Sequence, residues 1–231
     1  RIAAWGIKEV FFLDQTFAAR RADALEFCLQ LASEKLNLKW ACLCRVDLID
    51  EELLIAMKAA GCHTIQFGVE TANETTLHAS NKPIDHKTTK QAFSLCARHS
   101  IRTVGHFIFG LPGDDKNSAK QTVELAIVLD CDFAAFNIAE AVVGTSMQEE
   151  AINADWQLTP DPSQPYSFPQ SSGVTFGEVN EWRRMAIRQF YFRPSYWLKR
   201  LRDVQSWHEI KRLFSNGLHI FKKHRVWAGK S

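Results

Sequence analysis

Polar side chains that could do chemistry recur in this sequence at or near the ends of short apolar runs. They are Asp14, Gln15, Arg45, Asp47, Glu70 and His106. Carboxylates, a guanidinium and an imidazole in one place would suit a small polar ligand that carries an amine, a carboxylate and hydroxyl groups. Because these residues are far apart in the sequence, they can form a site only if the fold brings the ends of the runs together.

The apolar runs predict buried strands, each followed by a helical segment. We expect strands at 9–14, 40–47, 64–70, 103–109 and 133–138, and helices over about 20–36, 50–60, 86–99 and 118–129. Five β-then-α units of roughly 30 residues predict a right-handed wound parallel sheet or a barrel. In such folds the carboxyl ends of the strands gather at one edge and ligands bind there. The six polar residues would therefore converge.

Charge is divided unevenly along the chain. Residues 181–231 hold 13 Lys and Arg against 3 Asp and Glu, whereas residues 1–180 carry a net charge of −8. We expect three segments: a barrel portion at 1–150, a linker or long loop at 151–180, and a basic, aromatic helical extension at 181–231. The extension could pack its aromatic rings on the barrel with its charges in water, lie on an anionic membrane surface, or meet RNA phosphates.

The six cysteines show no paired secretory spacing, and the sequence has no signal peptide and no apolar run long enough to cross a bilayer. These features predict a cytoplasmic protein, with peripheral membrane association through 181–231 as an open alternative. Cys42 and Cys44 alternate along one strand, where a packing role is the ordinary interpretation and a metal role the alternative.

Several short motifs, in order and at the right spacing, closely resemble the radical S-adenosylmethionine (SAM) superfamily, in its branch that carries an N-terminal cobalamin-binding domain. The resemblance covers residues 1 to about 150. The motifs are Phe11 to Phe17, Trp40 with Cys44 to Asp47, Leu53 to Cys62, Phe67 to Thr71, and Gly105 to Gly113. The fold that this implies is α/β, a partial (β/α)6 TIM-like barrel of which strands 2 to 6 are present.

The family's first strand leads into a Cys-x3-Cys-x2-Cys loop that holds a [4Fe-4S] cluster, and none of the six cysteines has that spacing. We therefore expect the cluster loop to lie upstream of Arg1. The resemblance implies SAM and a [4Fe-4S] cluster as cofactors, with cobalamin bound through an upstream domain as an open question.

The resemblance also implies individual roles. Asp14 and Gln15 would contact the methionine amine, although related proteins often have an acidic residue in place of Gln15. Glu70 and His106 would contact the ribose, and Lys82 would pair with the methionine carboxylate. The turns that begin at Gly110 and Ile138 would present backbone to the adenine, and Arg45 completes the expected cofactor-binding set. As alternatives, Glu70 could cap a helix, His106 could be a core histidine and Lys82 a solvated charge.

The function that this resemblance implies is reductive cleavage of SAM to a 5'-deoxyadenosyl radical, followed by cobalamin-dependent methyl transfer, rearrangement or cyclisation. The partners would be a small-molecule or lipid-like substrate and an electron donor such as flavodoxin or ferredoxin, with no nucleic acid. The main alternative is a non-catalytic barrel that binds SAM or a partner. A plain barrel hydrolase or isomerase would need a His-rich metal motif or a nucleophile signature, which the sequence lacks.

Overall fold

The structure is a computed structural model and describes residues 5–73, 76–77, 85–154, 157–160, 167–170 and 173–202. Its centre is a sheet of five parallel strands in the order β1-β2-β3-β4-β5. The strands are β1 (Glu9–Phe12), β2 (Lys39–Cys44), β3 (Cys62–Glu70), β4 (Arg102–Phe109) and β5 (Phe133–Ile138). Because neighbours in space follow the order of the chain, the sheet winds in one direction, as in a barrel, and does not reverse like a doubly wound sheet.

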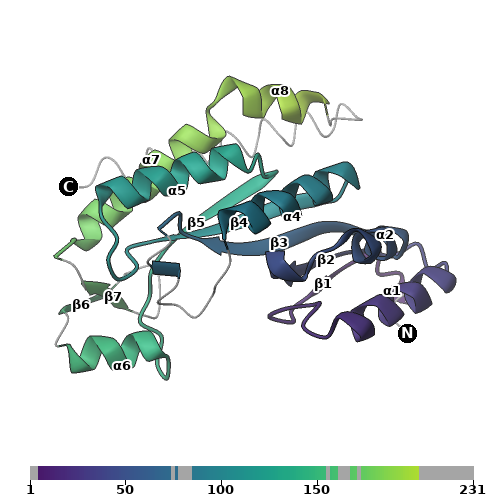
Figure 1. Cartoon of the computed structure of the whole chain (residues 1–231), viewed down its shortest axis with the longest axis horizontal. Coiled ribbons are helices and arrows are strands. Elements are labelled where there is room, and N and C mark those ends of the chain that lie inside the picture. Colours follow the sequence, from purple (N-terminus) through teal and green to yellow (C-terminus); the bar gives the residue numbers. More distant parts are fainter. Residues whose placement is uncertain are drawn as a thin grey trace.

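A helix of nine to thirteen residues follows each of the first four strands (Figure 1). These helices are α1 (Arg21–Ser33), α2 (Glu51–Ala59), α4 (His86–Arg98) and α5 (Lys116–Val128), and a short 3-10 helix, η2 (Val46–Leu48), precedes α2. Right-handed crossovers in a sheet wound one way place all its helices on the same face. The predicted α/β fold with strands 2 to 6 of a partial barrel is thereby confirmed, with strand and helix ends shifted by a few residues.

Aspartates at the predicted helix starts act as N-caps. The Asp50 carboxylate accepts a hydrogen bond from the Leu53 N–H at 2.9 Å, and Asp115 and Ser118 form a capping box at the start of α5. Such caps satisfy backbone N–H groups that have no partner within the helix. They therefore fix where each helix leaves the preceding loop.

The two faces of the sheet differ in burial, as the period of two along a strand requires. Along β4, Thr103, Gly105, Phe107 and Phe109 are buried beneath the helices, whereas Val104, His106 and Ile108 on the opposite face are only half-buried. In β3 the same open face carries Gln66, Gly68 and Glu70. The open face is the inner face of the partial barrel, and it is where polar side chains occur.

Beyond β5 the chain continues through α6 (Ser146–Asn153), an antiparallel pair of short strands, β6 (Gln157–Pro160) and β7 (Ser167–Gln170), α7 (Phe176–Tyr191) and α8 (Pro194–Arg202). Helix α7 packs against α5, β4 and β5 (Figure 1). The segment 151–180 thus contains a strand pair and the start of α7, while its boundaries with the other two predicted segments stay a prediction.

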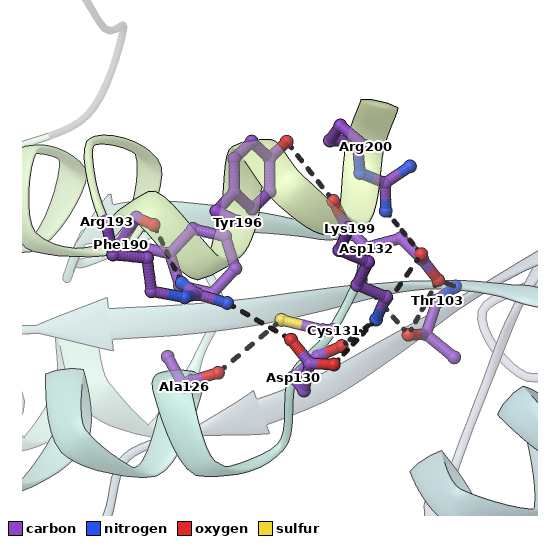
Figure 2. A network of polar contacts seen from close by, with 10 residues as sticks. All are labelled: Thr103, Ala126, Asp130, Cys131, Asp132, Phe190, Arg193, Tyr196, Lys199 and Arg200. Carbon is purple, nitrogen blue, oxygen red and sulfur yellow. Dashed lines mark hydrogen bonds and ion pairs between the residues drawn. The ribbon is translucent and has the colours of Figure 1, made fainter. Parts of the chain in front are cut away.

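Helix α8 is held to the loop before β5 by ion pairs (Figure 2). Asp130 pairs with Arg193 at 3.3 Å and with Lys199 at 2.9 Å, and Asp132 pairs with Arg200, whose side chain is 5% exposed. The same Asp132 accepts a hydrogen bond from the Thr103 N–H at 2.8 Å. Three cations of the described part of the extension therefore bind carboxylates of the barrel rather than facing water. Residues 203–231 lie outside the described residues.

None of the helices within the described ranges is both long enough and apolar enough to cross a membrane.

Candidate functional site at the carboxyl ends of the strands

Strand pairing places the predicted site residues at one edge of the sheet. Gly68 of β3 lies opposite His106 of β4, and Glu70 lies opposite Phe107. Cys44, the last residue of β2, lies opposite Phe67, so the adjoining Arg45 is level with Gly68. Arg45, Glu70 and His106 therefore share the carboxyl edge. Asp14 and Gln15, both exposed, follow the end of β1 at the same edge.

Glu70 has an unusual backbone conformation at the last position of β3. Its φ is +69°, in the left-handed region, and the pairing of β3 with β4 shifts by one residue between Gly68 and Glu70. Left-handed residues other than glycine cost about 1 kcal/mol or more and cluster at sites where the strain serves function. A half-buried carboxylate is thus held in a strained position where a glycine would fit more easily.

His106 makes a hydrogen bond on the open face of the sheet. Its Nε2 lies 2.8 Å from Oε1 of Gln66, one strand away in β3. Burial lowers the pKa of His106, and the nearby Glu70 carboxylate opposes this change. The ring is therefore neutral at physiological pH, and Glu70 is close enough to interact with it electrostatically.

Arg45 is already paired within its own loop. Its Nε and Nη2 donate to the two carboxylate oxygens of Asp47 at 3.0 and 2.8 Å, and both side chains remain partly exposed. The Asp47 hydrogen bond raises the pKa of Arg45, and the same hydrogen bond lowers the pKa of Asp47. A ligand anion that used Arg45 would share the guanidinium with Asp47.

The turn after β4 is pinned by Asp114. This buried carboxylate accepts hydrogen bonds from the N–H groups of Gly110 at 3.0 Å and Leu111 at 3.1 Å, and from the Ser118 hydroxyl at 3.0 Å. Gly110 has a φ of +80°, which glycine adopts without strain. Since the Gly110 N–H is engaged by Asp114, its carbonyl is the backbone group that could meet an adenine.

The loop after β3 is fastened to the middle of α5. The Thr122 hydroxyl accepts a hydrogen bond from the Ala72 N–H at 2.9 Å and lies 3.2 Å from the Thr71 hydroxyl. Thr76 Oγ1 donates to the Pro112 carbonyl at 3.3 Å, which joins this loop to the turn after β4. These contacts set the position of Glu70 relative to the neighbouring turn.

Of the two remaining predicted site residues, the structure describes Ile138 but not Lys82. Ile138 ends β5 opposite Phe109 and is buried with its side chain on the helix-covered face, and the next N–H, that of Ala139, donates to the Phe109 carbonyl at 2.8 Å. Any contribution of Ile138 to a ligand site would come from its backbone. Lys82 lies outside the described residues.

An iron–sulfur cluster does not fit the described part of the chain. No three His, Cys, Asp or Glu side chains within it are grouped so that they could hold a metal ion. The six cysteines are buried, and burial raises the pKa of Cys28 and Cys96 to about 12. Iron needs thiolates, so the raised pKa of these two thiols disfavours metal binding and is typical of packing groups. The packing interpretation of Cys42 and Cys44 agrees with their burial on the helix-covered face.

The acceptors at the carboxyl edge do fit a ligand that has hydroxyl groups. Glu70 and the neutral His106 lie at adjoining positions of neighbouring strands, and both can accept hydrogen bonds from O–H donors. SAM carries two such hydroxyls on its ribose.

Sequence reasoning assigned no role to Gln66 or Asp114. Gln66 interrupts an apolar strand on the same face as Glu70, and the alternation along β3 was the signal that could have identified it. Asp114 directly follows the Gly105–Gly113 motif, but its hydrogen bonds to Gly110 and Leu111 can be seen only in the structure.

Comparison with known proteins places the chain in a family. Residues 1–126 match the family model described as the radical SAM superfamily. An uncharacterized methyltransferase of Pyrococcus horikoshii is 30% identical over 94% of this chain and 48% of its own length. The anaerobic magnesium-protoporphyrin IX monomethyl ester cyclase of Rubrivivax gelatinosus is 30% identical over 50% of this chain and 22% of its own length. The chain thus spans at most about half the length of these relatives.

Solved structures share the fold. The radical SAM methyltransferase TsrM of Kitasatospora setae superposes with a TM-score of 0.64 at 20% identity, over 70% of this chain and 35% of that one. The cobalamin-dependent SAM radical enzyme OxsB superposes with a TM-score of 0.64 at 16% identity, over 97% of this chain and 40% of that one. The family match, supported by this common fold, shows that the chain belongs to the radical SAM superfamily of enzymes.

Proposed function

We propose that the carboxyl edge of the sheet binds SAM, and that the protein to which this barrel belongs cleaves SAM reductively to a 5'-deoxyadenosyl radical. The observation that carries the proposal is Glu70, a carboxylate held at a φ of +69° beside the acceptor His106. Evolution tolerates such strain where a side chain must point in one direction for function. The family of the chain supports the same assignment.

In this proposal the chain binds and orients the cofactor. Glu70 and His106 accept from the ribose hydroxyls, Asp14 and Gln15 face the methionine amine, and Lys82 pairs with the methionine carboxylate. The carbonyl of Gly110 and the backbone at Ile138 face the adenine. When bound, the cofactor system supplies an electron to SAM and the radical chemistry that follows.

The [4Fe-4S] cluster would be held by residues other than those described, since the described residues do not fit it. The relatives are at least twice as long as the part that this chain matches, which leaves room for a cluster loop and a cobalamin domain elsewhere in such a protein. The similarity to the uncharacterized methyltransferase of Pyrococcus horikoshii favours methyl transfer as the reaction, ahead of rearrangement or cyclisation. The partners of the protein to which this chain belongs would be a small-molecule or lipid-like substrate and an electron donor such as flavodoxin or ferredoxin, in the cytoplasm.

The first test is calorimetric titration of SAM into the full chain. Glu70→Ala removes a charged acceptor and should weaken binding by about 1.5 to 3 kcal/mol. Glu124→Ala is the matched control, because Glu124 is an exposed helix carboxylate that forms only a 3.8 Å pair with Lys120. Equal affinity of the parent and Glu70→Ala would remove Glu70 from the site and refute the proposal.

A second candidate is a non-catalytic barrel that binds SAM or a partner without a cluster. The described residues hold no group that could bind a metal ion, so this chain by itself does not separate the two candidates. The two candidates are separated by anaerobic incubation with iron and sulfide, carried out on the chain and, separately, on the longest natural form of the protein. Cluster absorbance and SAM cleavage in the longer form support the enzyme, and SAM binding with neither in that form supports the second candidate.

A further inference from the structure

Gln66 is the nearest hydrogen-bonding neighbour of the predicted ribose contact His106, yet it had no assigned role. Both side chains are half-buried on the open face of the sheet, and Oε1 of Gln66 lies 2.8 Å from Nε2 of His106. With Oε1 as the atom of Gln66 that faces His106, the carboxamide accepts the hydrogen bond, and this arrangement favours the imidazole tautomer with its proton on Nε2. The pairing of β3 with β4 places the two residues as diagonal neighbours, because Gly68, two residues beyond Gln66, lies opposite His106.

The tautomer decides what the other ring nitrogen can do. With the proton on Nε2 of a neutral ring, Nδ1 carries a lone pair and accepts hydrogen bonds. Within the described ranges the His106 ring makes no hydrogen bond besides the one to Gln66, so Nδ1 is available to a ligand. In the opposite tautomer Nδ1 would carry the proton and donate a hydrogen bond, so it could not accept one from a hydroxyl.

We propose that Gln66 is a positioning residue that holds His106 as the Nε2–H tautomer, so that Nδ1 and Glu70 form a pair of acceptors for a vicinal diol. Two acceptors at adjoining positions of neighbouring strands complement two O–H donors on adjacent carbons. They do not complement a ligand that offers acceptors at the same places. The ligand part of this inference rests on the proposed function, whereas the tautomer is a property of the protein without ligand.

The tautomer is measured directly by nitrogen-15 NMR of the histidine rings in the full chain, at a pH above the ordinary imidazole range. The parent should show His106 protonated at Nε2. Gln66→Leu should shift the ring toward a mixture of tautomers, and Gln66→Glu should keep the Nε2–H form because a carboxylate oxygen also accepts. Gln30→Leu, which removes a carboxamide from an exposed position of α1, is the matched control.

The role of Nδ1 is measured by titrating SAM into two variants of His106. The side-chain oxygen of His106→Asn can take the place of Nδ1, so this variant should bind nearly as well as the parent. His106→Gln reaches toward the position of Nε2 and should bind roughly fivefold more weakly, the equivalent of one net hydrogen bond. Gln66→Leu alone should weaken binding by no more than about twofold, because an even mixture of tautomers leaves half of the rings competent. In the His106→Asn background it should weaken binding no further.

The two parts fail in different ways. A parent ring protonated at Nδ1, or a Gln66→Leu ring with an unchanged tautomer, would overturn the inference about Gln66. Equal effects of the Asn and Gln variants, or additive effects of Gln66→Leu and His106→Asn, would also overturn it. If the NMR results are as expected but the parent chain does not bind SAM, the tautomer stands and the proposed function of the edge fails.

Discussion

Replacing Asp132 by asparagine should destabilise the fold far more than the same change at Asp130. Asp132 is 14% exposed and faces Arg200, which is 5% exposed, whereas Asp130 is 60% exposed and pairs with Arg193 and Lys199. Both residues lie in the short loop between α5 and β5 (Figure 2). The pair of variants therefore compares one chemical change at two levels of burial.

The magnitude follows from what each variant leaves behind. Asp132→Asn removes the charge that compensates a buried guanidinium, and breaking a buried ion pair costs about 3 to 5 kcal/mol. The asparagine oxygen can keep the 2.8 Å bond from the Thr103 N–H, so we expect the lower end of that range, about 3 kcal/mol. Asp130→Asn changes a carboxylate that is 60% exposed, and the largely buried Arg193 keeps its bond to the Phe190 carbonyl, so we expect a loss of at most about 1 kcal/mol. Asparagine tolerates the left-handed φ of +46° at this position.

Urea unfolding of the full chain, followed by circular dichroism, gives both free energies on one scale. A change of about 3 kcal/mol in a chain of this size should lower Tm by roughly 6 to 12 °C. Two results would refute the reasoning: equal losses in the two variants, or a loss below about 1 kcal/mol for Asp132→Asn. Either would mean that Arg200 finds water or another partner when the Asp132 charge is removed.

Three further predictions concern the carboxyl edge and its supports. Glu70→Gly should stabilise the fold by up to about 1 kcal/mol because it relieves the left-handed φ, and it should weaken SAM binding as much as Glu70→Ala does; a loss of stability would contradict the strain argument. Asp114→Ala leaves the N–H groups of Gly110 and Leu111 without their acceptor and should lower the free energy of unfolding in urea by about 2 to 4 kcal/mol. The control Asp115→Ala removes an exposed helix cap and should lower it by about 1 kcal/mol. Burial lowers the pKa of His106 in the folded chain, so the unfolded chain binds more protons just below the ordinary histidine pKa of about 6.5. Stability should therefore fall as the pH drops below that value, and the slope should be shallower in His106→Asn; identical pH profiles would show that His106 is not the group responsible.

Much of the fold could be predicted because the information is local. Apolar runs of the right length mark the strands, and Asp50, Asp85 and Asp115 mark helix starts through their own side-chain bonds to nearby N–H groups. The order of the strands follows from their regular alternation with helices. The convergence of Arg45, Glu70 and His106 follows in turn from that order, since parallel strands end at one edge.

The rest depends on contacts between distant parts of the chain. The bond from Gln66 to His106 joins residues 40 positions apart and requires the register of β3 with β4. Glutamate is not a residue that favours a left-handed conformation, so nothing about Glu70 in the sequence foretells its φ. The pairing of Asp132 with Arg200 spans 68 positions. Composition alone left open whether the cations of the extension face water, a membrane surface or RNA.

The two edges of the sheet are built on opposite principles. At the amino edge, Asp130 and Asp132 bind cations and Thr103 so that α8 is fixed to the barrel. At the carboxyl edge, Glu70 is strained and His106 contacts Gln66 on the open face. In barrels the amino edge serves stability and the carboxyl edge serves chemistry. Asp132→Asn should therefore lower the unfolding free energy and leave SAM affinity unchanged. Glu70→Ala should lower SAM affinity and leave the unfolding free energy nearly unchanged. A variant at either edge that lowered both quantities would show that the two edges are coupled through the sheet.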